Sequence, residues 1–195
     1  MLLFVVDDHP LMREAIVMLF RRIAPTARIV EMGSIAAVAL KVKEHGTPDI
    51  FCLDLKLPDA IDVSGVRKIR TAYPQTPIVV LSASPASDCE ALCLEAGADL
   101  YVEKSAGATQ LTQTFNALLS SEHDFAPQPT LTEKLSRRQI EMLQQLDRGL
   151  SNKEIADTLH ISEHTVKVHL WRLFRRLEVK SRNQATHWAR AQGYL

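Results

Sequence analysis

The sequence predicts a doubly wound α/β domain with a five-stranded parallel sheet, followed by an all-α, four-helix domain of the helix-turn-helix type. Three observations lead to this prediction. Short apolar runs alternate with segments of helical periodicity in the first half, the second half carries helical periodicity alone, and acidic and basic residues are distributed unequally between the halves. A chain of 195 residues is long enough for one domain of ordinary size and a smaller one.

Five short apolar runs rich in β-branched or aromatic residues predict the strands of the sheet. They are residues 2–6, 28–32, 50–53, 78–81 and 100–102. Apolar residues at helical spacing between and after these runs predict five helices, at residues 11–23, 35–44, 63–72, 87–96 and 109–119. Because each strand is almost continuously apolar, we expect a parallel sheet that is covered by helices on both faces.

A polar segment with two prolines separates the two halves of the chain. Prolines and polar residues interrupt helices, so residues 120–130 are expected to link a domain at 1–119 to a domain at 131–195. Residues 1–119 contain 11 Lys+Arg against 14 Asp+Glu, a net charge of −3, whereas residues 131–195 contain 12 against 7, a net charge of +5. The formal net charge of zero therefore hides an acidic domain and a basic one.

The composition is that of a globular protein, with 46% hydrophobic residues, 24% charged residues and a mean hydropathy of −0.05. No apolar run approaches the length of a membrane-spanning helix. The first residues lack the basic segment and the cleavage site of a signal peptide. A cytoplasmic location is therefore expected.

Polar residues follow four of the predicted strands, at the end where an open α/β sheet binds its ligands. They are Asp7 and Asp8 after the first strand, Asp54 after the third, Ser82 after the fourth and Lys104 after the fifth. Three carboxylates within several ångströms repel by a few kcal/mol per pair at an effective dielectric constant of about 20, so cations must lie among them. Lys104 would supply one charge, and Mg²⁺, which prefers carboxylates, water and phosphate oxygens, would supply the rest.

Asp54 is the candidate nucleophile for a phosphoryl group, because the same ion would neutralise the phosphoryl oxygens. Lys104 and the Ser82 hydroxyl would then contact those oxygens. Taken singly, these residues have ordinary structural alternatives: Asp7 or Asp8 as a helix cap, Lys104 as a surface charge and Ser82 as a turn residue. Their convergence at one edge of the sheet favours the functional interpretation.

Residues 1–119 resemble the receiver domains of two-component response regulators, which have a flavodoxin-like fold. The resemblance rests on VVDDHP at 5–10, LDLKLPD at 53–59, VLSA at 80–83 and AGADLYVEK at 96–104. It implies that Asp54 accepts a phosphoryl group from a histidine kinase. It also implies a Mg²⁺ site formed by Asp7, Asp8, Asp54 and the Lys56 carbonyl, and a switch pair formed by Ser82 and Tyr101.

Three positions depart from the usual receiver pattern. The loop between Pro58 and Gly65 is longer than in most receivers, Leu100 replaces a frequent glycine, and Ser105 replaces a frequent proline. The longer loop gives some support to one alternative, a degenerate receiver that is regulated by protein contact without phosphorylation. The other alternative is a Mg²⁺-dependent aspartyl phosphohydrolase, but such enzymes place a general-acid carboxylate where this chain has Lys56.

The second domain has the spacing of a helix-turn-helix, with predicted helices at 152–159 and 163–177 joined by a short turn. Four helix starts carry an N-cap serine, and the first, second and fourth also have the Glu or Gln partner of a capping box: Ser136, Ser151, Ser162 and Ser181. One face of the helix at 163–177 is apolar and is expected to be core: Val166, Leu170, Leu173, Phe174 and Leu177. The opposite face carries three arginines and is expected to expose Val168 and Trp171.

This domain resembles the LuxR/FixJ-type DNA-binding domain through LSRRQ at 135–139, GLSNKEIA at 149–156, ISEHTVKVH at 161–169 and LEVKSR at 177–182. The resemblance implies that the helix at 163–177 enters the major groove of DNA. Candidate contacts to DNA lie on this helix and just after it: Thr165, Lys167, Val168, Trp171, Arg172, Arg175, Arg176, Lys180 and Arg182. The last helix, near 182–192, is expected to form a dimer.

Together the two halves resemble two-component response regulators of the NarL/FixJ family, with a LuxR-type helix-turn-helix. Phosphorylation of Asp54 by a sensor histidine kinase is expected to shift the receiver between two conformations. The active conformation would either expose the recognition helix or favour a homodimer that binds two half-sites of promoter DNA.

Overall fold

The computed structural model describes residues 1–119, 135–179 and 181–195. The chain divides into two compact units, Met1–Phe115 and Asn116–Leu195, each of which is considered by itself. The segment predicted to be the linker, 120–130, lies outside the described residues. None of the helices in the described parts of the chain is long and apolar enough to span a lipid bilayer.

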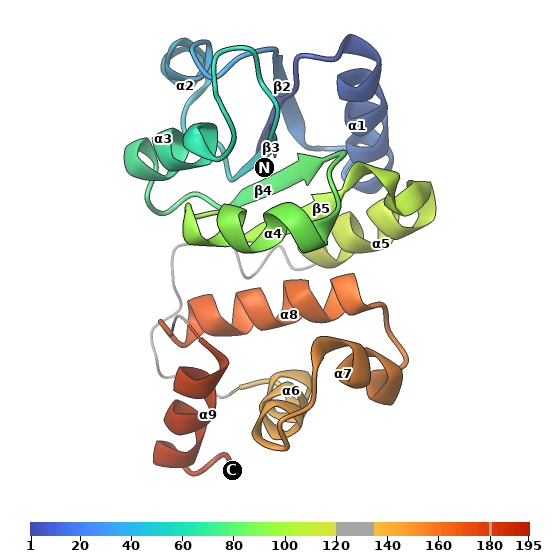
Figure 1. The fold of residues 1–195 in the computed structure, drawn as a ribbon, viewed down its shortest axis with the longest axis vertical. Coiled ribbons are helices and arrows are strands. Elements are labelled where there is room, and N and C mark those ends of the chain that lie inside the picture. The colour runs from blue at the N-terminus through green and yellow to red at the C-terminus, as the bar shows by residue number, and fades with distance from the viewer. Residues whose placement is uncertain (120–134, 180) are drawn as a thin grey trace. The chain divides into compact units, whose positions relative to one another are not determined.

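The N-terminal unit is built on five parallel strands in the order β2-β1-β3-β4-β5, which is the flavodoxin-like order (Figure 1). The strands are β1 (Leu2–Val6), β2 (Arg28–Met32), β3 (Ile50–Asp54), β4 (Ile78–Ser82) and β5 (Leu100–Glu103). All five lie where the apolar runs predict them, and the predicted doubly wound parallel sheet is confirmed. The last three strands each extend one residue further than predicted, into Asp54, Ser82 and Glu103.

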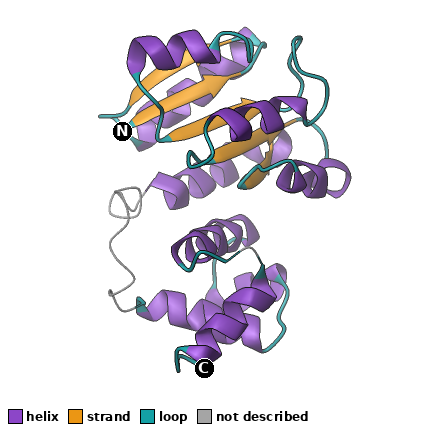
Figure 2. Cartoon of the chain, turned by 90° about the vertical axis from the view of Figure 1, so that its left-hand side faces the viewer, coloured by secondary structure: helices purple, strands orange, loops and turns teal. Residues whose placement is uncertain are grey.

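Helices cover both faces of this sheet (Figures 1 and 2). They are α1 (Pro10–Ile23), α2 (Val38–His45), α3 (Ser64–Ala72), α4 (Ala86–Glu95) and α5 (Gly107–Leu119), the last preceded by a 3₁₀ turn at Lys104–Ala106. On one face, α1 and α5 meet through the rings of Phe20 and Phe115, whose centroids are 4.5 Å apart. On the other face, Val38, Val66 and Cys93 bring α2, α3 and α4 into one apolar core with the strands.

The start of α2 differs from the prediction. The sequence pattern places a helix from residue 35, whereas α2 begins at Val38. The N–H groups of Ile35 and Ala36 instead donate to the Asp59 carboxylate, at 3.1 and 2.8 Å, from the loop after β3. A side chain distant in sequence therefore satisfies N–H groups in the segment before this helix.

The C-terminal unit consists of α6 (Arg137–Asp147), α7 (Asn152–Leu159), α8 (Glu163–Arg176) and α9 (Arg182–Ala191). Complete capping boxes start α6 at Ser136 and α7 at Ser151, as predicted. At Ser181 the hydroxyl accepts the Gln184 N–H as predicted. The turn between α7 and α8 passes through His160, whose φ of 53° is left-handed, and this confirms the predicted helix-turn-helix. The predicted apolar face of α8 lies in the core of this unit, with Phe174 partly buried against it.

Candidate functional site

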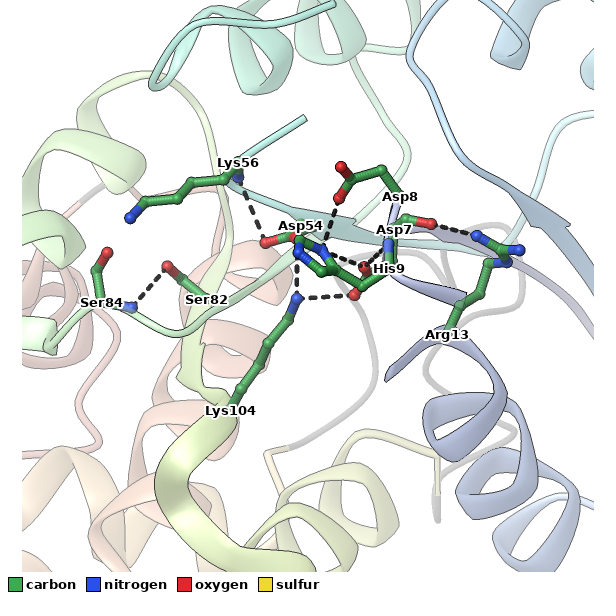
Figure 3. Close-up of polar contacts among 9 residues, drawn as sticks. All are labelled: Asp7, Asp8, His9, Arg13, Asp54, Lys56, Ser82, Ser84 and Lys104. Carbon is green, nitrogen blue, oxygen red and sulfur yellow. Dashed lines mark hydrogen bonds and ion pairs between the residues drawn. The ribbon is translucent and has the colours of Figure 1, made fainter. Parts of the chain in front are cut away.

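The carboxyl ends of β1, β3 and β5 bring four of the predicted site residues together (Figure 3). Asp7 and Asp8 follow β1, Asp54 ends β3, and Lys104 follows β5. These strands are parallel and in register, so their polar ends reach the same edge of the sheet. Their neighbours within the strands are buried apolar residues, which hold the backbone beneath the site.

Lys104 lies between two buried carboxylates. Its Nζ donates to Asp7 Oδ2 at 2.7 Å and forms an ion pair with Asp54 Oδ2 at 2.9 Å. The side chains of Asp7 and Asp54 are 1% and 4% exposed, and that of Lys104 is 10% exposed. Since attraction between charges is strong where water is scarce, the ammonium group holds both carboxylates in a fixed arrangement.

Burial affects the ionisation of Asp54. Burial raises the pKa of Asp54 above its usual range, Lys104 opposes that rise, and the nearby charge of Asp7 adds to it. Its Oδ1 atom accepts a long hydrogen bond, 3.4 Å, from the Lys56 N–H. Lys56 thus touches the site through its N–H, and the role of its carbonyl as a metal ligand stays a prediction.

The start of α1 holds Asp7 in place. The His9 N–H donates to Asp7 Oδ1 at 2.9 Å, and Arg13 Nη1 donates to the Asp7 carbonyl at 2.6 Å. Sequence reasoning missed both residues. The sequence could have identified His9 as a site residue. Histidine is a common metal ligand, and here it directly follows two aspartates and precedes a proline that starts a helix.

The residues present fit a hard divalent cation. Asp7, Asp8, His9 and Asp54 each offer a ligand atom, and these four atoms all lie within 4.8 Å of one another. Asp8 Oδ1 is buried, and the His9 Nδ1 atom lies 2.7 Å from it, so a nitrogen and a carboxylate oxygen meet at one point of the site. The predominance of carboxylate oxygens matches the preference of Mg²⁺.

Ser82 and Tyr101 meet the same loop after β4. The Ser82 hydroxyl oxygen accepts the Ser84 N–H at 3.1 Å, and the Tyr101 hydroxyl donates to the Ser84 carbonyl at 2.7 Å. Tyr101 is 1% exposed, and burial raises the pKa of its hydroxyl to about 12. Ser84 therefore connects the two residues predicted as a switch pair, whose role in switching stays a prediction.

The long loop between β3 and α3 folds back on the unit. Leu57 and Ala60 form a β-bridge and are buried in the core, while Asp59 binds the N–H groups ahead of α2. Ile61 at the tip is 82% exposed, and Asp62 has a left-handed φ of 48°. The extra residues thus form a packed turn beside the acidic site, which leaves the carboxylates in place.

The outer face of α8 combines basic and aromatic side chains. The Arg175 guanidinium lies 5.5 Å from the centre of the Trp171 ring, within reach of a cation–π interaction. Arg176 donates to Gln139 Oε1 at 2.7 Å and Arg182 donates to the Leu150 carbonyl at 2.6 Å. These bonds hold both arginines on the unit's own surface.

Two side chains of α8 are less exposed than the sequence pattern predicts. The sequence pattern predicts that Val168 and Trp171 are exposed, but Val168 is buried and Trp171 is half-buried, so this expectation was wrong. Helical periodicity shows which residues share a face, and it contains no information on what lies against that face. Lys180, another candidate DNA contact, lies outside the described residues.

A doubly wound sheet with three carboxylates and a lysine at its ligand-binding edge, followed by a helix-turn-helix, defines a phosphoacceptor-type domain joined to a DNA-binding-type domain. Family comparisons agree with this class. Residues 3–116 match the response regulator receiver domain, and residues 133–189 match the luxR family of bacterial regulatory proteins. The chain belongs to the response regulators of the NarL/FixJ family, and its homologues are transcriptional regulators.

Curated relatives are similar to this protein over nearly the whole chain. The chain is 30% identical to the glycerol metabolism activator of Pseudomonas putida, over 94% of this chain and 92% of that protein. It is 31% identical to the nitrate/nitrite response regulator NarP of Escherichia coli K12, over 93% and 91%. Among solved structures, a LuxR-family response regulator from Aurantimonas sp. SI85-9A1 is 31% identical with a TM-score of 0.54, over 61% of this chain and 84% of that one.

Proposed function

We propose that this protein controls transcription through phosphorylation of Asp54 by a sensor histidine kinase. The observation that carries the proposal is Lys104, which contacts both Asp7 and Asp54 at the carboxyl edge of the sheet. That arrangement places a buried nucleophile, a fixed cation and a second carboxylate around one point. It matches the needs of phosphoryl transfer, in which positioning and charge neutralisation do most of the work.

In the proposed reaction, an Asp54 carboxylate oxygen forms a bond to phosphorus while the phosphorus–nitrogen bond of a phosphohistidine breaks. The departing imidazole nitrogen keeps the electron pair and takes a proton from solvent. In this proposal Lys104, which lies beside Asp54, and the Ser82 hydroxyl, at the end of β4, would contact the transferred oxygens. Burial of Asp54 excludes water from the carboxylate that reacts.

We propose Mg²⁺ as the cofactor, held by Asp7, Asp8, Asp54 and the Lys56 carbonyl. When bound, the ion supplies positive charge to the oxygens of the phosphoryl group. Asp7 is fixed for this purpose by His9 and Arg13, which bind its carboxylate and its carbonyl. The buried Asp8 Oδ1 atom, which has no hydrogen-bond donor, would be one of the oxygens that hold the ion.

For the output, we propose that α8 reads the major groove of promoter DNA and that α9 supports a homodimer. The proposed contacts to DNA are Thr165, Lys167, Trp171, Arg172, Arg175, Arg176, Lys180 and Arg182, and Val168 is left out because its side chain is buried. The match to the luxR family and the excess of basic residues in 131–195 support this assignment. We propose that the two domains comprise residues 1–119 and 131–195. We also propose that the protein is located in the cytoplasm, where it meets DNA.

Phosphorylation of Asp54 is proposed to be stoichiometric and not a step of enzymatic turnover. The residue two positions after the nucleophile is Lys56, where a phosphohydrolase of this type needs a carboxylic acid as proton donor. A degenerate receiver is disfavoured by the intact contacts of Lys104 and by the packed loop after β3.

The proposal is tested by exposing the full chain to acetyl phosphate and Mg²⁺, followed by phosphate-affinity electrophoresis and promoter binding. The wild type and Asp88→Asn, which alters an exposed acid on α4, should form an acid-labile adduct and change their DNA affinity. Asp54→Asn should do neither. Equal promoter binding by all three proteins with and without the phosphodonor would refute the switch.

A further inference from the structure

The imidazole of His9 lies against all three carboxylates of the acidic site (Figure 3). Its Nδ1 atom is 2.7 Å from Asp8 Oδ1, 3.5 Å from Asp7 Oδ1 and 3.8 Å from Asp54 Oδ2. Two atoms that bind one ion at about 2.1 Å and at right angles lie about 3 Å apart. The nitrogen and the carboxylate oxygens are therefore spaced like neighbouring ligands of a single ion.

The backbone at the start of α1 directs this ring. His9 is the N-cap residue of α1, with extended backbone angles, and Pro10 follows at the first helical position. N-cap side chains commonly accept a hydrogen bond from the first turn of their helix, but the His9 side chain makes no capping bond. The backbone N–H of His9 donates to Asp7 Oδ1, and its imidazole faces the carboxylates.

Lys104 and His9 approach the carboxylates with different groups. Lys104 Nζ contacts Asp7 Oδ2 and Asp54 Oδ2, whereas His9 Nδ1 lies nearest to Asp8 Oδ1. Asp8 Oδ1 is buried beside the His9 ring, whose side chain is 67% exposed. The His9 ring is thus the solvent-facing part of the site, and an ion that enters there meets a nitrogen and a carboxylate oxygen.

We propose that His9 is a nitrogen ligand of this metal site, and that it makes the site bind first-row transition ions such as Co²⁺ and Mn²⁺ more tightly than carboxylates alone would. The inference rests on the proposed function, in which Asp7, Asp8 and Asp54 hold Mg²⁺. Imidazole nitrogen is a favoured ligand of transition ions, whereas Mg²⁺ prefers oxygen. His9 therefore determines the metal preference of the site and contributes little to Mg²⁺ binding.

Isothermal titration of the full-length protein with Co²⁺ and with Mg²⁺ tests this selectivity. The variants are His9→Ala and, as a matched control, His187→Ala, which removes an exposed histidine of α9. His9→Ala should weaken Co²⁺ binding by roughly 10- to 100-fold, the range seen when a group that supports a metal site is removed, and should leave Mg²⁺ binding nearly unchanged. His187→Ala should change neither.

Pulsed electron paramagnetic resonance with Mn²⁺ gives a second readout, independent of affinity. The wild type and His187→Ala should show coupling of the ion to a ligand nitrogen, and His9→Ala should lose it. Equal Co²⁺ affinity in wild type and His9→Ala, or tighter binding of both ions by His9→Ala, would overturn the inference, since His9 would then be a bystander or a competitor of the ion.

The outcome for His9 is separable from that for the proposed function. If Mg²⁺ binding and Asp54 phosphorylation persist while His9→Ala binds Co²⁺ like the wild type, the role of His9 alone is refuted. If the wild type forms no adduct with acetyl phosphate and Asp54→Asn binds Mg²⁺ as the wild type does, the proposed function is refuted as well.

Discussion

Lys104 is the cation between two buried carboxylates, so its replacement leaves their charges isolated. Its Nζ lies 2.7 Å from Asp7 Oδ2 and 2.9 Å from Asp54 Oδ2. At an effective dielectric constant of about 20, each contact corresponds to about 6 kcal/mol of Coulomb attraction before the cost of desolvation is subtracted. Removal of one partner of a buried ion pair costs about 3–5 kcal/mol, so Lys104→Met should destabilise the N-terminal unit by about 3 kcal/mol or more.

The loss should depend on pH in a defined direction. Burial already raises the pKa of Asp54 and Lys104 opposes the rise, so Lys104→Met raises that pKa further. The folded state then binds a proton more readily than the unfolded chain, and the stability lost at neutral pH returns as the pH falls. Mg²⁺ should also restore part of it at neutral pH, by replacing the missing charge.

Hydrogen exchange of the amides of β1 and β3 measures this effect, because it reports the opening of the N-terminal unit alone. The control is Lys41→Met, since Lys41 pairs with Glu44 at 2.8 Å on the surface, with side chains 32% and 41% exposed. Such a pair contributes less than about 1 kcal/mol. The reasoning is refuted if Lys104→Met loses no more stability than Lys41→Met, or if its loss is the same at neutral and mildly acidic pH.

Three further changes test other parts of the chain. Without Mg²⁺, Asp54→Asn should raise the melting temperature measured by calorimetry, because burial penalises the ionised carboxylate, while Asp88→Asn should not; a lower melting temperature for Asp54→Asn would contradict this. Gly97→Ala should cost roughly 1–2 kcal/mol in urea unfolding, because Gly97 has a φ of +105° and a Cβ there would lie 2.7 Å from Arg70 Cγ; unchanged stability would contradict the strain. Ser151→Ala should cost about 1 kcal/mol by the same measurement through loss of the α7 capping box, and a neutral result would show that the cap is dispensable.

The strands and the acidic site were predictable because each depends on a local pattern. Almost continuous apolar runs mark buried parallel strands, and a parallel sheet necessarily brings their carboxyl ends to one edge. Asp7, Asp54 and Lys104 could therefore be placed together without coordinates. The capping boxes at Ser136 and Ser151 were equally local, since each involves residues three apart.

The remaining features depend on contacts between segments distant in sequence. The segment ahead of α2 is bound by Asp59, which accepts two N–H groups more than twenty residues earlier in the chain. The orientation of Arg13 toward the Asp7 carbonyl depends on how α1 leaves the sheet, and no spacing rule encodes it.

The charges of the site explain why it should respond to ligands. Asp7, Asp8 and Asp54 carry three negative charges and Lys104 carries one positive charge, which leaves a net charge of −2 when His9 is neutral. One divalent cation balances this charge, and a phosphoryl group on Asp54 then adds negative charge close to Lys104 and Ser82. Each event changes the forces on the loops after β1, β4 and β5. Because packed interiors move between discrete arrangements and do not deform continuously, such charge steps favour a switch between two states over a graded response.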